Sequence, residues 1–135
     1  MEQEKSSSRS SDGITYEAII DMKLPSFNEY INEERTNRFR AAKMKKDLEE
    51  QISWFLRRLP HFETRIKIDF IWIEENNKRD PDNCCFNKKF ILDAMVKLGI
   101  ITNDNRKYVG AFADYFPKPT GESAKVILKI SEMDE

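Results

Sequence analysis

The sequence predicts a mixed α+β domain, in which a small mixed β-sheet is covered by helices. Two patterns carry this prediction. Residues 65–75 alternate between apolar and polar side chains, which is typical of a half-buried strand. Residues 32–59 form a long helical pattern, in which apolar side chains recur every three or four positions from Ala41 to Leu59, as is typical of a helix with one buried face. Strands and helices that follow one another in a short chain favour one sheet with helices packed against it.

The first half of the chain is expected to hold an arm, a strand and a long helix. Residues 1–13 are rich in serine and charge and show no periodicity, so we expect a disordered N-terminal arm. A single domain should then cover residues 14–135. Its first strand is predicted over residues 15–23, and its long helix over residues 32–59, ended by Pro60.

The second half follows the alternating strand with a helix and two more strands. We expect the helix to begin near Asp82 or Asn83, as N-cap, and to end at Gly99, whose freedom at positive φ suits a helix terminus. Its apolar stripe consists of Phe86, Phe90, Ile91, Ala94, Met95 and Leu98. Two further strands are predicted over residues 107–116 and 124–131.

The composition limits the classes of function. A chain of 135 residues with 39% hydrophobic residues can form one domain with a modest core. The net charge of −1 gives no overall attraction to nucleic acid, so any DNA contact requires a local patch. Cys84 and Cys85 are adjacent, which suits neither a disulfide framework nor a zinc site. Without a membrane-span or signal-peptide pattern, we expect a soluble, cytoplasmic protein with no membrane partner.

A pair of aspartates around a proline is the strongest chemical signal. Pro81 disfavours a helical conformation for the preceding residue, so Asp80 is expected to be extended. In an extended segment Asp80 and Asp82 would point the same way and converge. Two adjacent carboxylates stay ionised most easily around a cation, and oxygen ligands suit Mg²⁺. Taken alone, the same two aspartates could also be ordinary turn and cap residues.

A basic run on the long helix is the second signal. Between residues 35 and 46 there are six basic residues and no acidic one. They are Arg35, Arg38, Arg40, Lys43, Lys45 and Lys46. The run predicts either a phosphate-binding stripe or a solvated helix face that the acidic residues after it balance.

Other residues receive simpler interpretations. Lys89 and Asp93 are four positions apart on a helix face away from the apolar stripe, so Asp93 is expected to pair with Lys89 or Lys97, or to support the site. Trp54 and Trp72 are expected in the core. A single histidine, His61, makes neither a metal site nor a catalytic pair and receives no role.

Together these motifs resemble the RusA-type Holliday junction resolvases, which are phage and bacterial endodeoxyribonucleases. The shared pattern is Arg-Asp-x-Asp-Asn, a helix with Lys-x-x-x-Asp-Ala, and Gly-Ile-Ile before an acidic turn, and it is specific over residues 78–105. The resemblance implies that Asp80, Asp82 and Asp104 are catalytic and bind Mg²⁺, with Mn²⁺ as a substitute. It also implies that Lys89 assists catalysis. The stretch between Asp82 and Asp93 is longer than in the shortest members, so the choice of Lys89 over Lys88 depends on the alignment.

The resemblance implies a RusA-like fold and an enzyme that resolves four-way DNA by paired phosphodiester hydrolysis in recombination and repair, acting as a homodimer. Contacts to the branched DNA are expected from Arg35, Arg38, Arg40, Lys43, Lys46 and Arg79. One alternative is a DNA-junction or single-strand binder without cleavage, because Asn103 stands where many members carry an acid. Another is a nucleotide phosphohydrolase, which the absence of clustered glycines disfavours.

Overall fold

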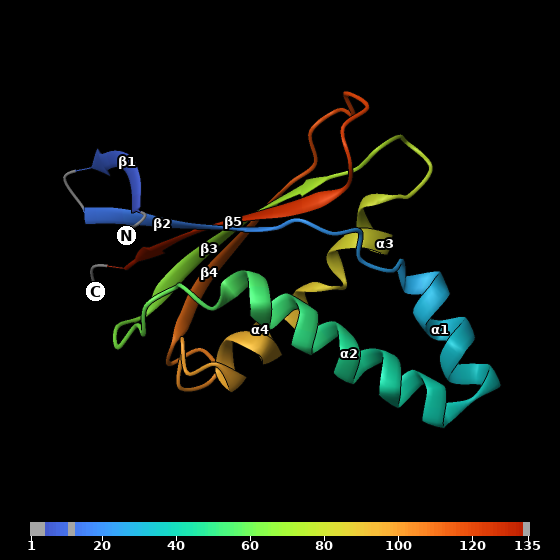
Figure 1. Ribbon diagram of the computed structural model, residues 1–135. Helices are drawn as coiled ribbons and strands as arrows, with labels where there is room; N and C mark the ends of the chain where they lie inside the picture. Colours follow the sequence, from blue (N-terminus) through green and yellow to red (C-terminus); the bar gives the residue numbers. More distant parts are fainter. Residues whose placement is uncertain (1–4, 11–12, 134–135) are drawn as a thin grey trace.

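The sheet is mixed and has five strands in the part of the chain that the computed structural model describes, residues 5–10 and 13–133. The strands are β1 (Lys5–Ser10), β2 (Gly13–Ile20), β3 (Ile66–Ile73), β4 (Val109–Tyr115) and β5 (Lys125–Glu132). Their order across the sheet is β1-β2-β5-β3-β4 (Figure 1). Only β3 and β4 pair in parallel; the other neighbours are antiparallel.

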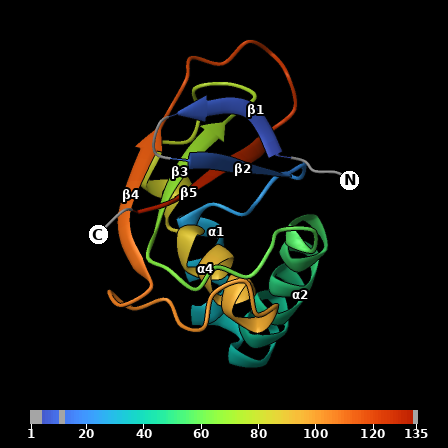
Figure 2. The ribbon, with the colours of Figure 1, turned by 90° about the vertical axis from the view of Figure 1, so that its left-hand side faces the viewer.

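Four helices of the described chain pack with this sheet. They are α1 (Phe27–Thr36), α2 (Arg38–Leu56), α3 (Pro81–Cys85) and α4 (Lys88–Lys97). Figure 2 shows α1, α2 and α4 gathered on one side of the sheet. The predicted α+β class, with a small mixed sheet and helices against it, is therefore confirmed.

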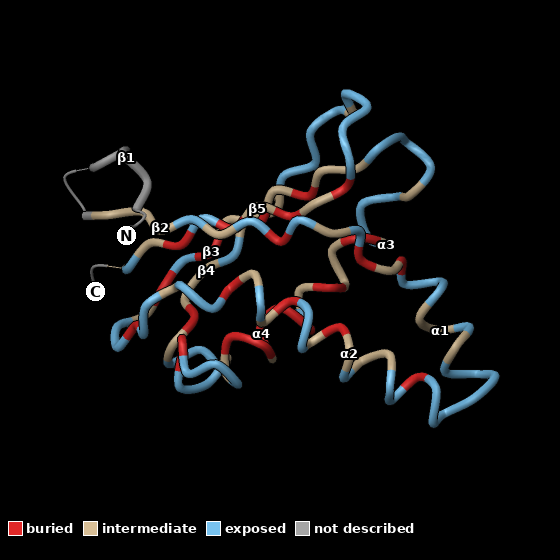
Figure 3. Tube along the Cα trace, viewed as in Figure 1, coloured by how far each residue is buried: buried red, intermediate tan, exposed pale blue. Residues whose placement is uncertain are grey.

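The core lies between the inner face of the sheet and the helices. Period-2 alternation in β3 buries four side chains on one face, as predicted. These are Ile66, Ile68, Phe70 and Trp72. The helices supply Ile52 and Leu56 from α2 and Ile91 and Met95 from α4, all fully buried. In Figure 3 the buried segments face one another between sheet and helices, while the outer sides of α1 and α2 are exposed.

The prediction of one long helix over residues 32–59 is wrong, because two helices meet at Asn37. The Ser26 hydroxyl accepts a hydrogen bond from the Glu29 amide, and the Glu29 carboxylate accepts one from the Ser26 amide, so α1 begins earlier than predicted. The Asn37 side chain accepts from the amides of Phe39 and Arg40 and begins α2. The Asn37 cap lies before the apolar pattern, which begins at Ala41, so that pattern did not mark the break between the helices.

The end of α4 follows the prediction. Gly99 has φ of 77°, and the amides of Gly99 and Ile100 donate to the carbonyls of Val96 and Met95. This is a Schellman arrangement, in which a left-handed residue lets the chain satisfy the last helical carbonyls. It turns the chain sharply toward the segment that holds Asp104.

The N-terminal arm was expected to be disordered over residues 1–13. Within that range the structure describes β1, which pairs with β2 with a register shift between Lys5 and Arg9, and Gly13 as the first residue of β2. Edge pairing needs only backbone groups, so it leaves no apolar periodicity in the sequence. Residues 1–4 and 11–12 lie outside the described residues.

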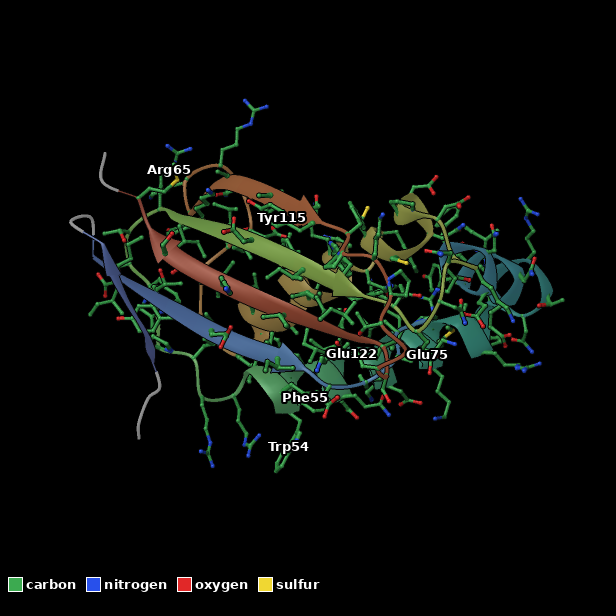
Figure 4. The ribbon with its side chains drawn as sticks, turned by 90° about the horizontal axis from the view of Figure 1, so that it is seen from above. Trp54, Phe55, Arg65, Glu75, Tyr115 and Glu122 are labelled. Carbon is green, nitrogen blue, oxygen red and sulfur yellow. The ribbon has the colours of Figure 1, made fainter. Side chains whose placement is uncertain are left out.

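The prediction that Trp54 lies in the core is wrong. Its side chain is 59% exposed, whereas Trp72 is buried as predicted. Figure 4 shows Trp54 projecting from α2 away from the body of the protein. The Arg57 guanidinium lies 3.5 Å from the centre of the Trp54 ring and covers part of it.

None of the described helices has the length and apolarity needed to cross a membrane.

Candidate functional site

The two aspartates around Pro81 lie at the start of α3. Asp80 is the N-cap, with extended backbone (φ −74°, ψ 157°), as predicted. Pro81 occupies the first turn of the helix, where its missing N–H costs nothing, and Asp82 follows it there. The expectation that Asp82 continues an extended segment is therefore wrong, and so is the choice of Asp82 or Asn83 as N-cap. The proline begins a helix instead of prolonging a strand.

Both carboxylates are exposed and uncommitted. The Asp80 side chain makes no capping hydrogen bond. Neither Asp80 nor Asp82 forms an ion pair or side-chain hydrogen bond with any residue that the structure describes. An acidic residue in the first turn interacts favourably with the helix dipole, and this interaction contributes about 0.3–1 kcal/mol at an exposed site. That benefit alone does not require two carboxylates, so both remain available to a ligand.

A buried polar network fixes α3 in place. Arg79 donates through Nη2 to the Leu24 carbonyl at 2.8 Å, and its Nε lies 3.3 Å from a Glu74 carboxylate oxygen. Asn87 donates through Nδ2 to the carbonyls of Pro25 (2.8 Å) and Cys84 (2.9 Å). Both side chains thereby tie the start of α3 and α4 to the segment that leads into α1.

Arg79 was expected to contact DNA, but its position favours a structural role. Only 15% of its side chain is exposed. The environment of the neighbouring Cys84 supports this interpretation. Burial, reinforced by the charge of Glu74, raises the pKa of the Cys84 thiol to about 11. Cys84 is therefore a neutral core thiol and not a nucleophile or a thiolate ligand.

Lys89 joins two parts of the motif. Its Nζ lies 3.1 Å from Asp93 Oδ1 and 3.6 Å from Asp104 Oδ2. The predicted pairing of Lys89 with Asp93 is confirmed. The hydrogen bond to Asp93, with the charges of Asp93 and Asp104, raises the pKa of Lys89, so this lysine stays protonated. Its side chain is 65% exposed and can reach a phosphate.

Lys88 lies on the other side of α4, against the sheet. Its Nζ is 2.7 Å from Asp114 Oδ2 and lies over the rings of Phe112 (4.7 Å) and Phe70 (5.2 Å). Trp72 donates through Nε1 to Asp114 Oδ1 at 2.9 Å. Sequence reasoning missed Asp114, because only the parallel pairing of β3 with β4 brings it to this position.

The expected three-aspartate metal site is not a preformed cluster. Within the residues that the structure describes, no group of three His, Cys, Asp or Glu side chains is arranged to hold a metal ion. Asp104 is held by Lys89, whereas Asp80 and Asp82 stand at the start of α3. The donor chemistry of these two does fit Mg²⁺, which is commonly held by one or two carboxylates, with water and substrate phosphate completing its shell.

The basic run spans the last turn of α1 and the first half of α2, and all of its residues except the half-buried Lys45 are exposed. Arg40 pairs with Glu33 and Lys43 with Asp47, both at 2.8 Å. The hydrogen bond to Asp47 raises the pKa of Lys43. Arg35 and Arg38 make no ion pair with any described residue. The run therefore combines cations balanced within the helices with cations available to an anionic partner.

Comparison with known proteins adds no identification. No family model matches the chain, and no curated protein is significantly similar to it. Any function must therefore be argued from the residues of this chain.

Proposed function

We propose that this protein is a Mg²⁺-dependent, structure-selective endodeoxyribonuclease that resolves four-way DNA junctions by paired phosphodiester hydrolysis, in recombination and repair. The contact between Lys89 and Asp104, at 3.6 Å, carries the proposal. These residues belong to separate parts of the motif, fifteen positions apart, and the resemblance assigns both to one active site. A shared active site requires the side chains of Lys89 and Asp104 to lie close together, as they do here.

The free carboxylates give further support. Asp80 and Asp82 are exposed and unpaired within the described chain, and Asp80 makes no capping hydrogen bond although it is the N-cap of α3. A bound Mg²⁺ would supply water activation and stabilisation of the leaving oxygen. Asp80 and Asp82 would hold it, with Asp104 as the third expected ligand. Arg79 and Asn87 position these ligands by anchoring α3.

Lys89 would act on the phosphate. As a protonated group at an exposed position, it can offset the negative charge that develops on the phosphoryl oxygens in the transition state. Asp93 restrains the lysine from one helical turn away. The neighbouring Lys88 is already occupied by Asp114, which favours Lys89 for this role.

A resolvase must cut two strands symmetrically, so we propose a two-fold homodimer acting in the cytoplasm. An isologous contact would hold two identical active sites at a fixed separation. The partner is branched DNA, recognised through phosphates by the basic run.

A second candidate is a junction-binding protein without cleavage. It is favoured by one observation, namely that the three aspartates do not converge in the described chain. Labelled four-way junctions and matched linear duplexes, each incubated with and without Mg²⁺, separate the two. Paired cuts in junctions alone, dependent on Mg²⁺, support the nuclease. Junction-selective binding without cuts supports the second candidate, and equal treatment of both DNAs overturns both.

A further inference from the structure

The corner between α1 and α2 presents an aromatic side chain to solvent. Phe39 is 88% exposed, the highest value among the exposed large hydrophobic residues of the described chain. It is the second residue of α2, in the first turn after the one-residue link at Asn37. Figures 1 and 3 show this corner at the end of the helical layer farthest from β1, within an exposed segment.

The fold itself gives Phe39 no role. The N-terminus of α2 is capped by the Asn37 side chain, which needs only the backbone amides of Phe39 and Arg40. The Phe39 ring makes no contact with another aromatic ring of the described residues. A polar residue would serve this turn equally well and would keep an apolar ring out of water.

The surroundings of Phe39 are strongly basic. Arg35, Arg38 and Arg40 are exposed around it, and the first turn of α2 contains no acidic residue. Arg38 and Arg40 lie in the first turn of α2 and oppose its helix dipole, so helix stability does not explain them, whereas Arg35 lies in the last turn of α1, where a cation is favourable. Of the three, only Arg40 has an ion-pair partner in the described chain, Glu33. The charges therefore favour an anionic partner.

We propose that Phe39 stacks on a nucleobase of unpaired or unstacked DNA, while Arg35 and Arg38 contact the adjacent phosphates. This inference rests on the proposed function and specifies where the branched substrate is recognised. Exposed aromatic rings beside cations are how proteins hold single-stranded DNA, because every base offers a π face. A continuous duplex keeps its bases stacked and offers no such face, whereas the centre of a junction does.

The corner is mechanically connected to the free carboxylates. From α1, Phe27 and Tyr30 pack on Phe86 at ring distances of 5.5 and 6.0 Å, and Tyr30 packs on Phe90 at 5.5 Å. These contacts fix α1 against the segment that joins α3 to α4. Phe39 would therefore hold the DNA at a constant distance from Asp80 and Asp82.

Direct binding measurements test the stacking role without cleavage. We would use full-length protein in EDTA with a four-way junction that carries 2-aminopurine at its centre, and a linear duplex of matched sequence. The variants are Phe39→Ala, Phe39→Trp and, as matched control, Trp54→Ala, which removes another exposed aromatic ring from the same helix. Circular dichroism melting would verify that each variant is folded.

We expect Phe39→Ala to weaken junction binding by roughly 5- to 150-fold. The variant should also abolish the change in 2-aminopurine fluorescence that accompanies binding of the wild type. Duplex binding should stay unchanged. Phe39→Trp should restore both readouts, and Trp54→Ala should match the wild type. The proposal is overturned if Phe39→Ala keeps wild-type junction affinity and signal. It is also overturned if this variant loses self-association, measured by sedimentation, while DNA binding remains, since the ring would then contact a second protein copy.

The two levels of the proposal fail in different ways. A wild-type protein that binds no DNA defeats the proposed function together with this inference. A wild-type protein that binds and cuts junctions, with Phe39→Ala indistinguishable from it, defeats only the stacking role.

Discussion

The two sides of α4 hold consecutive lysines in opposite environments. Lys88 faces the sheet, with 20% of its side chain exposed, and is held by Asp114 and two aromatic rings. Lys89 faces outward, with 65% exposed, between Asp93 and Asp104. One helical step of 100° separates a lysine committed to the fold from one available to a ligand. Burial, and not residue type, therefore decides which charge can do chemistry.

The acidic residues should show the largest effect. If the outward side of α4 and the start of α3 form one active site, then Asp80→Asn, Asp82→Asn and Asp104→Asn should each nearly abolish junction cleavage. Junction binding should remain or tighten, because each change removes an anion near DNA phosphates. Cleavage and gel-shift assays on the same samples check this. Wild-type cutting by any of the three would remove that residue from the site.

The two lysines test the comparison directly. If Lys89 acts on the phosphate as proposed, Lys89→Ala should lower cleavage by about 100-fold, since it removes a charge that would stabilise the transition state. Its effect on stability should stay within about 0.5 kcal/mol, as for an exposed ion pair. Lys88→Ala should reverse the pattern and destabilise the protein by about 1–3 kcal/mol, because Asp114 would keep only its hydrogen bond from Trp72 and lose its cationic partner in a partly buried site. Single-turnover cleavage and urea denaturation provide the two readouts, and a reversed ranking would move the active-site lysine to Lys88.

Arg79 and Arg38 offer a similar contrast among the arginines. Arg79→Gln should destabilise the protein by about 1–3 kcal/mol, since it leaves the Leu24 carbonyl and Glu74 without their partner. Arg38→Gln should leave stability unchanged but reduce the slope of log K against log salt by about 0.9. Binding titrations at several salt concentrations decide between them. If Arg79→Gln reduced this slope without loss of stability, Arg79 would instead be a DNA-contacting residue.

The smallest effect is expected for the buried thiol of Cys84. Because burial raises the pKa of Cys84 to about 11, native Cys84 should react with iodoacetamide only slowly at pH 8. The raised pKa means that folding favours the protonated thiol, so its contribution to stability is complete below pH 9 and decreases as the pH rises toward 11. Mass spectrometry of alkylated native protein, with Cys85→Ser to isolate the site, measures this. Rapid labelling at pH 8 would show that the α3 network opens easily.

Local patterns predicted some of these features and not others. The alternation in β3, the end of α4 at Gly99 and the pairing of Lys89 with Asp93 depend on neighbours within a few residues, and all three are confirmed. The break at Asn37 was missed because the apolar pattern begins only at Ala41, while the break depends on one polar capping side chain. Asp114 could not be found by spacing, since only strand pairing across the chain places it beside Lys88. Trp54 was misplaced because an apolar residue next to a stripe can point outward.

The position of β5 has a consequence for how the chain folds. Although β5 is the last strand in sequence, it lies in the middle of the sheet and pairs with both β2 and β3. During synthesis, β2 and β3 would each keep an unpaired edge until β5 is available, since each register depends on contacts of long sequence separation. The unit from β3 through α4 to β4 is far more local and is expected to form first. We therefore expect truncation before β5 to leave an aggregation-prone chain, and chaperone dependence during translation to end only when this strand closes the sheet.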